Sequence, residues 1–321
     1  MHLGVVGSGN IAGKVLSVLK SINIEAYALC CTERSIGSAR EMCEAYNIPS
    51  IQCDYDKFLN NEQMDTVYIA TPHSLHYPMA QKALKAGKNI IVEKPISIRY
   101  EETIELEKHA KNRGLFVFEA ISTPYLPMYG KMKEIVNELG EIKMAQCNFS
   151  QISTQYDNFK KGIIHHFFDS RNAGGALMDL GVYNYHYVVG LFGMPRSITY
   201  QANIEKAVDT SGVAILDYGS FKAVCIATKD SDGLSGCTIQ GTKGWVYQEN
   251  PANNCGTITV HMRGSNETQV YTAEKINRLE PEFRRYLQEI DDGDTSFCYK
   301  MFEQSLGVSK LLDESLNQMI K

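Results

Sequence analysis

The sequence predicts an α/β protein with two domains: an N-terminal doubly wound parallel sheet and a C-terminal α+β domain with a large, mostly antiparallel, open-faced sheet. Short apolar strands alternate with amphipathic helices from Leu3 to about Glu119, which is the pattern of a parallel sheet wrapped by helices. The alternation stops near Pro124 and Pro127. After Gly140, short strands follow at close spacing with turn residues between them, which favours an antiparallel sheet.

The length and the charge of the chain limit the classes of function. With 321 residues the chain is too long for one typical domain. We expect a dinucleotide-binding domain at 1–121 and a domain for substrate binding and oligomerisation at 122–321. The formal net charge of -5 argues against nucleic acid or an anionic membrane as the main partner. No apolar run approaches the roughly 18 residues that span a bilayer, and the first residues read as a strand and not as a secretory signal.

The cysteines indicate a reducing compartment. They are scattered along the chain, odd in number and without a C-x-x-C pair. Neither a disulfide framework nor a structural zinc site is expected from this spacing, so we predict a cytoplasmic protein without a bound metal. The nine are Cys30, Cys31, Cys43, Cys53, Cys147, Cys225, Cys237, Cys255 and Cys298.

The first strand, at 3–6, leads into the turn G-S-G-N-I-A at 7–12, and a helix follows to Ser21. A G-x-G-x-x-A turn between a strand and a helix predicts a dinucleotide site. The first glycine permits the tight turn, the second lets the backbone approach a pyrophosphate, and the alanine lets the helix pack on the strand. The helix start adds free N–H groups for the phosphates. The expected contacts are Gly7, Gly9, Asn10, Ile11 and Ala12.

The residues after the second strand, Ile24 to Cys31, decide between NAD and NADP. Glu33 lies near the position, roughly 20 residues past the motif, where a carboxylate holds the ribose 2′-OH of NAD. The neighbouring Arg34 can hold a 2′-phosphate instead. We expect both residues at the cofactor, with NADP preferred and NAD as the alternative.

The strand from Asp65 to Ala70 ends in the segment T-P-H-S-L-H at 71–76, where the cofactor should pass. Ser74 is expected to cap a helix that begins at about Leu75, and Gly87 is expected to end that helix in a left-handed conformation. The expected cofactor contacts in this segment are Thr71, Pro72, His73 and His76.

The next strand leads to a lysine. The run from Asn89 to Val92 is short and apolar, as in a strand buried on both faces, and Glu93, Lys94 and Pro95 follow it. Ligands of open parallel sheets lie beyond the carboxyl ends of the strands, so Lys94 is expected to point at bound ligand. Glu93 is expected to position the backbone or a ribose hydroxyl of the cofactor.

A second group of candidate residues lies in the run G-G-A-L-M-D-L-G-V-Y at 174–183. Asp179 and Tyr183 are four residues apart and share one helix face. Because an unpaired buried carboxylate is costly, Asp179 needs a partner, and a lysine of the first domain is one candidate. Arg171 is either a substrate contact or the partner of an acidic residue across a dimer interface. The expected substrate contacts are His165, His166, Arg171, Asn172 and His186.

Four motifs together resemble the glucose–fructose oxidoreductase / inositol dehydrogenase / rhizopine catabolism family (Gfo/Idh/MocA). They are G-S-G-N-I-A, A-T-P-H-S-L-H, A-G-K-N-I-I-V-E-K-P and G-G-A-L-M-D-L-G-V-Y. The resemblance covers the whole chain and looks closest to the branch with dimeric dihydrodiol dehydrogenases and sugar dehydrogenases. Inositol-dehydrogenase-like members have a histidine at the position of Tyr183. The resemblance implies NAD(P)-dependent oxidation or reduction at a secondary alcohol or hemiacetal carbon, with catalytic roles for Lys94, Asp179 and Tyr183.

The chemistry of these residues agrees with that expectation. A tyrosine with a pKa near 10 is a poor base alone, and a nearby ammonium favours the phenolate. We expect Tyr183, assisted by Lys94, to carry the hydroxyl proton while Asp179 holds the lysine. The alternative, that Lys94 itself carries the proton, stays open.

Two other readings of the function and one expectation about assembly remain. One alternative is a catalytically silent cofactor-binding regulator of the same fold, and another is an enzyme that uses its cofactor internally. A broad sheet with one open face predicts a homodimer or homotetramer.

Overall fold

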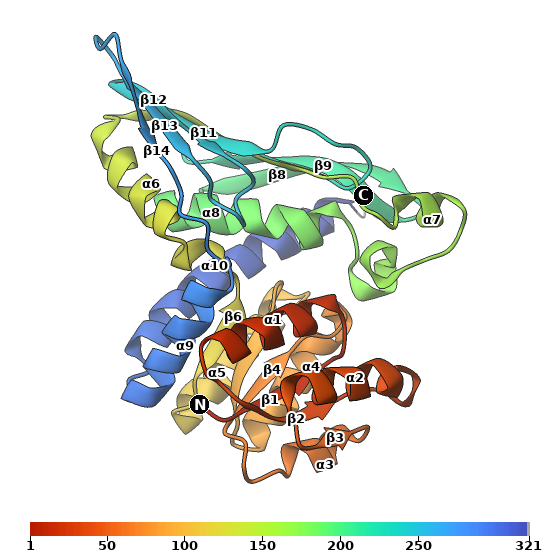
Figure 1. Ribbon diagram of the computed structural model, residues 1–321. Helices are drawn as coiled ribbons and strands as arrows, with labels where there is room; N and C mark the ends of the chain where they lie inside the picture. The colour runs from red at the N-terminus through yellow and green to blue at the C-terminus, as the bar shows by residue number, and fades with distance from the viewer. Residues whose placement is uncertain (320–321) are drawn as a thin grey trace. The chain divides into compact units, whose positions relative to one another are not determined.

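The computed structural model describes residues 1–319, so the last two residues of the expected 122–321 domain lie outside the described part. The chain forms two compact units (Figure 1). The first comprises Met1–Ala120 and Leu279–Leu306, and the second comprises Ile121–Arg278 and the chain from Gly307 on. The division at Ala120 lies next to the boundary expected from the sequence, whereas residues 279–306 belong to the first unit and not to the second.

A parallel sheet of six strands, in the order β3-β2-β1-β4-β5-β6, forms the centre of the first unit. The order changes direction between β1 and β4, which confirms the predicted doubly wound sheet. The strands are β1 Leu3–Val6, β2 Ala26–Cys30, β3 Ile51–Gln52, β4 Thr66–Ile69, β5 Asn89–Glu93 and β6 Val117–Ala120. The helices are α1 Asn10–Ser21, α2 Ile36–Tyr46, α3 Tyr55–Leu59, α4 His73–Lys85, α5 Tyr100–Arg113, α9 Glu280–Asp292 and the first part of α10 Ser296–Met319.

Helix α9 joins the first unit through aromatic packing on the sheet. The ring of Phe283 meets Tyr68 of β4 edge-on, with 5.7 Å between ring centroids, and the ring of Tyr286 stacks on Phe118 of β6 at 4.3 Å. Buried aromatic pairs of this kind contribute about 0.5–1.5 kcal/mol beyond the area that they bury. This packing, beside α1, explains why a segment late in the chain completes the first unit.

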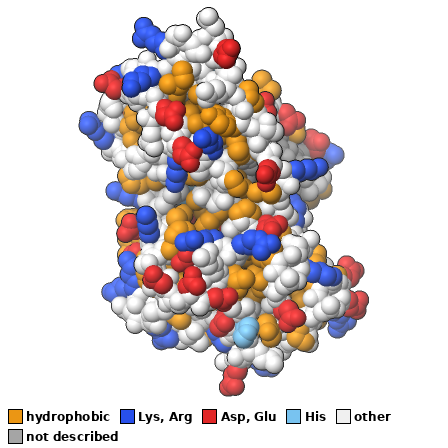
Figure 2. Space-filling model, turned by 60° about the vertical axis from the view of Figure 1, so that its left-hand side comes forward, with side chains coloured by type: hydrophobic (Ala, Val, Ile, Leu, Met, Phe, Trp, Pro, Cys, Tyr) orange, Lys and Arg blue, Asp and Glu red, His pale blue; other side chains and the backbone are white. Residues whose placement is uncertain are grey.

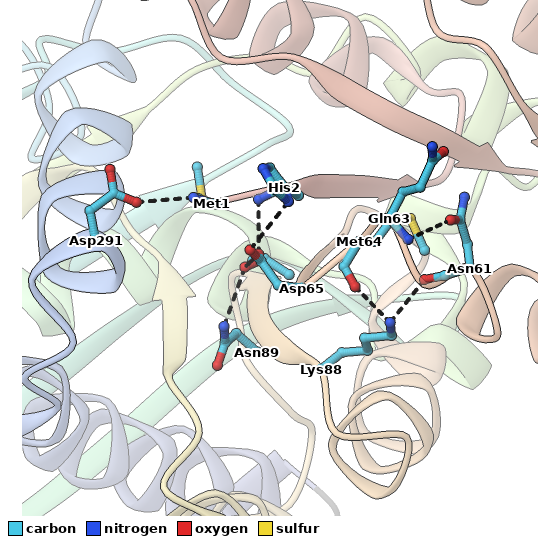
Figure 3. A network of polar contacts seen from close by, with 10 residues as sticks. Met1, His2, Asn61, Gln63, Met64, Asp65, Lys88, Asn89 and Asp291 are labelled. Carbon is cyan, nitrogen blue, oxygen red and sulfur yellow. Dashed lines mark hydrogen bonds and ion pairs between the residues drawn. The ribbon is translucent and has the colours of Figure 1, made fainter.

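Polar contacts close the amino ends of β1, β4 and β5, as Figure 3 shows. The ammonium of Met1 lies 3.0 Å from Asp291 Oδ1 of α9, and the N–H of His2 donates to Asp65 Oδ1 at 2.9 Å. Lys88 Nζ donates to two backbone carbonyls of the loop before β4, at 2.9 and 2.6 Å. These contacts occupy the sheet edge opposite the carboxyl ends, where ligands of such sheets bind.

The start of α4 differs from the sequence expectation. The helix begins at His73, with Pro72 as the N-cap residue and no side-chain capping bond, so the predicted cap by Ser74 before Leu75 is wrong. Pro72 has φ -57° and an extended ψ of 147°, and this fixed backbone places the helix start directly after it. The predicted left-handed end is confirmed, since Gly87 has φ +76°.

The second unit contains a sheet of eight strands in the order β14-β13-β12-β11-β7-β10-β9-β8. Its pairs are antiparallel except β7 with β10, which confirms the predicted mostly antiparallel sheet. The strands are β7 Ile142–Ser150, β8 Ser197–Glu205, β9 Val208–Asp217, β10 Lys222–Thr228, β11 Gly236–Gly241, β12 Gly244–Glu249, β13 Ile258–Met262 and β14 Thr268–Tyr271. The helices are α6 Pro127–Glu138, α7 Tyr156–Lys160, α8 Val182–Phe192 and the last part of α10.

Helices α6 and α8 cover one face of this sheet (Figure 1). Side chains of the central strands alternate between that buried face and the open one. Cys147 of β7 pairs in register with Cys225 of β10 and Cys237 of β11, and all three thiols are buried in the core. All nine cysteines are free. Large exposed apolar side chains on the strands of this sheet include Met144, Val213, Ile215, Trp245 and Val270.

Charged side chains of both signs are interspersed on the face drawn in Figure 2, without a broad basic area. Within residues 1–319, no helix is both long enough and apolar enough to cross a bilayer.

Candidate active site

The turn after β1 has the backbone that a dinucleotide site needs. Gly7 has φ +108°, and a Cβ there would lie 2.3 Å from the carbonyl oxygen of Ala70, so a side chain is excluded at this position. Gly9 is the N-cap residue of α1, and no side chain caps the helix start. A Cβ at Gly9 would meet no atom within 4 Å. The backbone is therefore uncrowded at Gly9, directly before the N–H groups of Asn10 and Ile11 that begin α1.

These residues fit a nicotinamide dinucleotide. The turn lies where the strand order reverses between β1 and β4, which is where open α/β sheets bind ligands. The fully buried Ala12 lets α1 pack closely on the sheet. At the end of β4, the hydroxyl oxygen of Thr71 is buried and has no hydrogen-bond partner among the described residues, so it is available to a bound ligand.

Glu33 and Arg34 lie in a short 3₁₀ turn, Glu33–Ser35, directly after β2. Both side chains are exposed. The turn is held by Thr32 and Ser35, whose hydroxyl oxygens lie 2.9 Å apart. Arg34 has no hydrogen bond or ion pair with another described residue, so its guanidinium is available to a ligand. The choice between ribose hydroxyl and 2′-phosphate stays a prediction.

His76 joins the segments that follow β4 and β5. Its Nε2 lies 2.8 Å from the carbonyl oxygen of Thr71, and its Nδ1 lies 2.8 Å from that of Pro95. The ring is fully buried, and burial lowers the pKa of His76, with the nearby charge of Lys94 acting in the same direction. Since both ring nitrogens face backbone carbonyls, this side chain positions the two segments. The expected cofactor contacts of Pro72, His73 and His76 stay predictions.

The residues after β5 are held in the first unit by buried hydrogen bonds. Tyr68 of β4 donates its hydroxyl hydrogen to Glu93 Oε1 at 2.7 Å, which fixes the Glu93 side chain next to Lys94. The N–H of Ile96 donates to Glu119 Oε1 at 3.0 Å. Lys94 is half-buried at the carboxyl edge of the sheet, in agreement with the position predicted from the strand pattern.

The helix that was expected to carry both Asp179 and Tyr183 consists of a π-helical segment followed by an α-helix. Asp179 lies in a π-helical segment, Leu177–Gly181, and Tyr183 lies in the first turn of α8. Insertions of π-helix occur frequently at functional sites. Before this segment, Gly175 has φ +141° and a Cβ there would lie 1.8 Å from Asp209 Oδ1. The glycine thus lets Asp209 approach the start of the helix.

Asp209 anchors the start of this helix. Its Oδ2 accepts hydrogen bonds from the N–H of Leu177 at 2.7 Å and from the hydroxyl of Tyr200 at 2.8 Å. The side chain is 2% exposed, and burial raises the pKa of Asp209 to about 6, opposed by these two hydrogen bonds and by Lys229. Asp209 thus fixes the segment that carries Asp179.

A buried lysine of the second unit, Lys229, pairs with Asp179. Its Nζ lies 2.8 Å from Asp179 Oδ2, and the two side chains are 3% and 18% exposed. The candidate partner expected from the sequence was a lysine of the first domain, whereas Lys229 belongs to the second unit. The expected link between Asp179 and Lys94 stays a prediction. The signal that was missed is the alternation of β10, in which Cys225 and Ala227 are buried and Lys229 follows at the same spacing.

The expected substrate residues have different surroundings. His165 and His166 are half-buried. Burial lowers the pKa of both histidines, and that of His166 is about 4, so both rings are neutral at pH 7. His186 is 1% exposed in α8, and direct contact with a substrate requires its surroundings to open. The remaining two expected substrate residues are Arg171 and Asn172.

Arg171 and Asn172 contact a carboxylate of their own loop. The Arg171 side chain is 85% exposed, and its Nη2 lies 2.8 Å from Asp169 Oδ2. Asn172 Nδ2 donates to the same oxygen at 3.4 Å. Arg171 therefore has an acidic partner within its own chain, two residues away, and the considered partner across a dimer interface stays a prediction. Among residues 1–319, no cluster of three or more His, Cys, Asp or Glu side chains is suited to a metal ion.

Two protein-family models match the chain. Residues 1–121 match a model described as an oxidoreductase family with an NAD-binding Rossmann fold, and residues 129–247 match a GFO/IDH/MocA C-terminal domain.

Several characterised proteins are similar in sequence. The scyllo-inositol 2-dehydrogenase (NADP(+)) IolU of Bacillus subtilis is 27% identical over 323 residues, covering 99% of this chain and 97% of that protein. The trans-1,2-dihydrobenzene-1,2-diol dehydrogenase of Oryctolagus cuniculus is 30% identical over 251 residues, covering 75% of this chain and 73% of that protein.

Solved structures share the fold. A 3-ketoreductase from Actinomadura kijaniata, in complex with TDP-benzene and NADP, superposes with a TM-score of 0.84 at 21% identity and covers 98% of this chain and 96% of its own. An NAD binding oxidoreductase from Klebsiella pneumoniae superposes with a TM-score of 0.86 at 20% identity, covering 100% and 97%.

Proposed function

Because the chain belongs to the Gfo/Idh/MocA family of NAD-binding oxidoreductases, we propose that it is a dehydrogenase or reductase for sugars, polyols or dihydrodiols. It transfers a hydride between the nicotinamide and a secondary alcohol or carbonyl carbon. One observation carries this proposal: the glycine turn after β1 and the Glu93–Lys94 pair at the end of β5 lie at the carboxyl ends of strands of one doubly wound sheet.

The cofactor is proposed to be NADP in preference to NAD. The exposed guanidinium of Arg34 supports this preference, because it is not engaged by another described side chain and suits a 2′-phosphate. The similar scyllo-inositol 2-dehydrogenase is named for NADP(+), and the 3-ketoreductase structure contains NADP. Glu33 supports the alternative, NAD, since its carboxylate suits a ribose 2′-OH.

Side chains of the protein transfer the proton of the substrate hydroxyl. When bound, the nicotinamide accepts or returns the hydride. Tyr183 takes the hydroxyl proton in oxidation and returns it in reduction, and the ammonium of Lys94 favours its phenolate form. Asp179 orients the cationic groups around the reacting hydroxyl. The anchoring of Asp179 by Lys229 supports a fixed role for this carboxylate.

The substrate is proposed to be a small polyhydroxylated or dihydrodiol compound. The names of the similar proteins support this class, since one acts on an inositol and another on a dihydrobenzenediol. His165 and His166, both neutral at pH 7, are suited to hydrogen-bond substrate hydroxyls. The resemblance supports a nearer relation to dihydrodiol and sugar dehydrogenases, because this chain has Tyr183 where inositol dehydrogenases have a histidine.

The decisive experiment measures cofactor reduction over a panel of aldoses, polyols and dihydrodiols, with NADP and NAD in parallel. We expect turnover with one substrate group and faster turnover with NADP. Binding of each cofactor is measured separately by fluorescence titration. If cofactor binds and no compound of the panel turns over, the dehydrogenase proposal is contradicted and a silent cofactor-binding regulator is favoured. A purified protein that retains tightly bound cofactor favours an enzyme that uses its cofactor internally.

We also propose a cytoplasmic homodimer that forms through the open face of the eight-stranded sheet, with a homotetramer as the alternative. The large exposed apolar side chains on the strands of this sheet support a partner, because apolar side chains that share one surface often mark an interaction site. Nine free cysteines, most of them buried, suit a reducing compartment.

A further inference from the structure

Lys229 lies directly after β10 and continues the buried side of that strand. Cys225 and Ala227 are buried, and side chains of a strand alternate in direction. The N–H of Lys229 donates to the carbonyl of Thr210 at 2.8 Å, and its carbonyl accepts from the N–H of Ser153 at 2.9 Å. Paired on both sides, the backbone directs this lysine into the interior, and its side chain is 3% exposed.

The ammonium of Lys229 contacts two different elements. Its Nζ lies 2.8 Å from Asp179 Oδ2 in the π-helical segment and donates to the carbonyl oxygen of Phe167 at 3.1 Å. It also lies 4.5 Å from the ring centroid of Phe168 and 5.2 Å from that of Phe167, within the range of cation–π attraction. One side chain therefore joins the helix of the candidate catalytic carboxylate to the loop of the candidate substrate residues.

A buried lysine is costly unless it is paired and hydrogen-bonded. Removing one partner of a buried pair disturbs the charge that stays behind, so loss of the Lys229 ammonium is expected to change the environment of the Asp179 carboxylate. Replacing a buried ion pair by well-packed apolar side chains is often neutral or stabilising. A buried ion pair beside a π-helical segment therefore favours a functional role over a purely stabilising one.

From these contacts we infer that Lys229 is a positioning residue, which fixes the Asp179 carboxylate relative to the loop that carries His165 and His166. This inference rests on the proposed function, since it assigns Lys229 a part in the same site. Lys229 acts through Asp179 and the loop and does not itself transfer a proton.

The charge of Lys229 acts on the titratable groups around it. The ammonium lowers the pKa of His165 and of His166, where burial is the larger cause, and it lowers that of Asp209. Asp179 opposes its effect on His166. Among the described residues, the charged and titratable groups that interact with Lys229 include Asp179, His165, His166 and Asp209. The ring of His166 is therefore a reporter of the ammonium that needs no substrate.

The test replaces the ammonium and follows that reporter. In Lys229→Met we expect the NMR titration midpoint of His166, assigned with a His166→Gln variant, to rise, because the ammonium that lowers this pKa is lost. We expect kcat to fall about tenfold or more, KM for the substrate to rise, the pH profile to change and the cofactor Kd to stay constant. Lys222→Met is the matched control, because Lys222 begins the strand that Lys229 follows, is partly exposed and pairs with Asp217. A folded Lys229→Met protein with the wild-type His166 titration and the wild-type pH profile overturns the inference.

A second measurement tests the inference if Lys229→Met does not fold. In the wild type, an ammonium held by Asp179 and a backbone carbonyl exchanges its protons slowly, so ¹⁵N-lysine NMR should show one Nζ signal that is absent in Lys229→Arg. Loss of this Nζ signal in Asp179→Asn supports the ion pair between Lys229 and Asp179. If the wild type shows no such signal, the ion pair and the inference are overturned. Neither NMR readout needs a substrate. A wild-type protein without turnover therefore contradicts the proposed function but not the positioning role of Lys229.

Discussion

Asp209 Oδ2 accepts a hydrogen bond of 2.7 Å from the backbone N–H of Leu177, the first residue of the π-helical segment that carries Asp179. A negative charge at a helix start is favoured by the helix dipole and by the free N–H groups there. Asp209 is nevertheless buried, and burial raises its pKa to about 6 from the usual 3.8. The anchor of the candidate catalytic helix is therefore a carboxylate that becomes protonated in mildly acidic solution.

The first prediction concerns stability and pH. Because the pKa of Asp209 is higher in the folded than in the unfolded protein, the folded state binds this proton more tightly. The stability from this group is present below about pH 4 and is lost as the pH rises through about 6, by about 3 kcal/mol in all. Asparagine at position 209 has no charge at any pH. We therefore expect the free energy of unfolding of Asp209→Asn, relative to that of wild type, to increase as the pH rises over that range.

Urea unfolding at intervals from pH 4 to pH 7.5 measures this difference. Asp292→Asn, at an exposed position of α9, is the control and should show no such trend. A difference between Asp209→Asn and wild type that does not vary with pH contradicts the raised pKa of Asp209.

The second prediction concerns the cofactor. Arg34→Ala should weaken NADPH by about 10- to 100-fold, as expected for the loss of a charge-assisted hydrogen bond of about 1.5–3 kcal/mol, and should leave NADH almost unchanged. Fluorescence titration with both nucleotides measures this. Arg40→Ala, at another exposed arginine of the same region, is the matched control. Equal loss of affinity for the two nucleotides rejects a contact with the 2′-phosphate.

The third prediction concerns proton transfer. Lys94→Ala and Tyr183→Phe should each lower kcat by about 10² or more, on the scale of general acid–base catalysis, while cofactor affinity stays within a few-fold of wild type. Lys85→Ala is the control, since Lys85 is exposed and its Nζ donates to Gln81 of the same helix. Turnover that survives Lys94→Ala removes Lys94 from the mechanism.

Local patterns were sufficient to predict most of the first unit. The glycine turn, the strand before Lys94 and the left-handed Gly87 each depend on a few adjacent residues, whose backbone preferences hold in any tertiary context. The return of α9 to the first sheet was not predictable in this way. It depends on contacts such as Phe283 with Tyr68, which join residues more than 200 positions apart and leave no mark in either local sequence.

The candidate site shows the same limit. The sequence indicated that Asp179 needs a partner, but it did not identify Lys229, since only the sheet register places that lysine beside the helix. The isolated charge after β10 was indistinguishable from a solvated turn residue. Arg171 shows the converse, because its partner Asp169 is two residues away and was not considered.

The last prediction concerns assembly through the open sheet face. Ile215 of β9 is 45% exposed and pairs in register with Val224 of β10, so it lies on an apolar part of that face. A stable homodimer needs about 1,200–2,000 Å² of buried surface, and a charge buried within it is costly. We therefore expect wild type to be dimeric and Ile215→Lys to be monomeric by light scattering at assay concentration. Leu234→Lys, at a loop residue that is 92% exposed, should remain dimeric, and a monomeric wild type rejects the proposed interface.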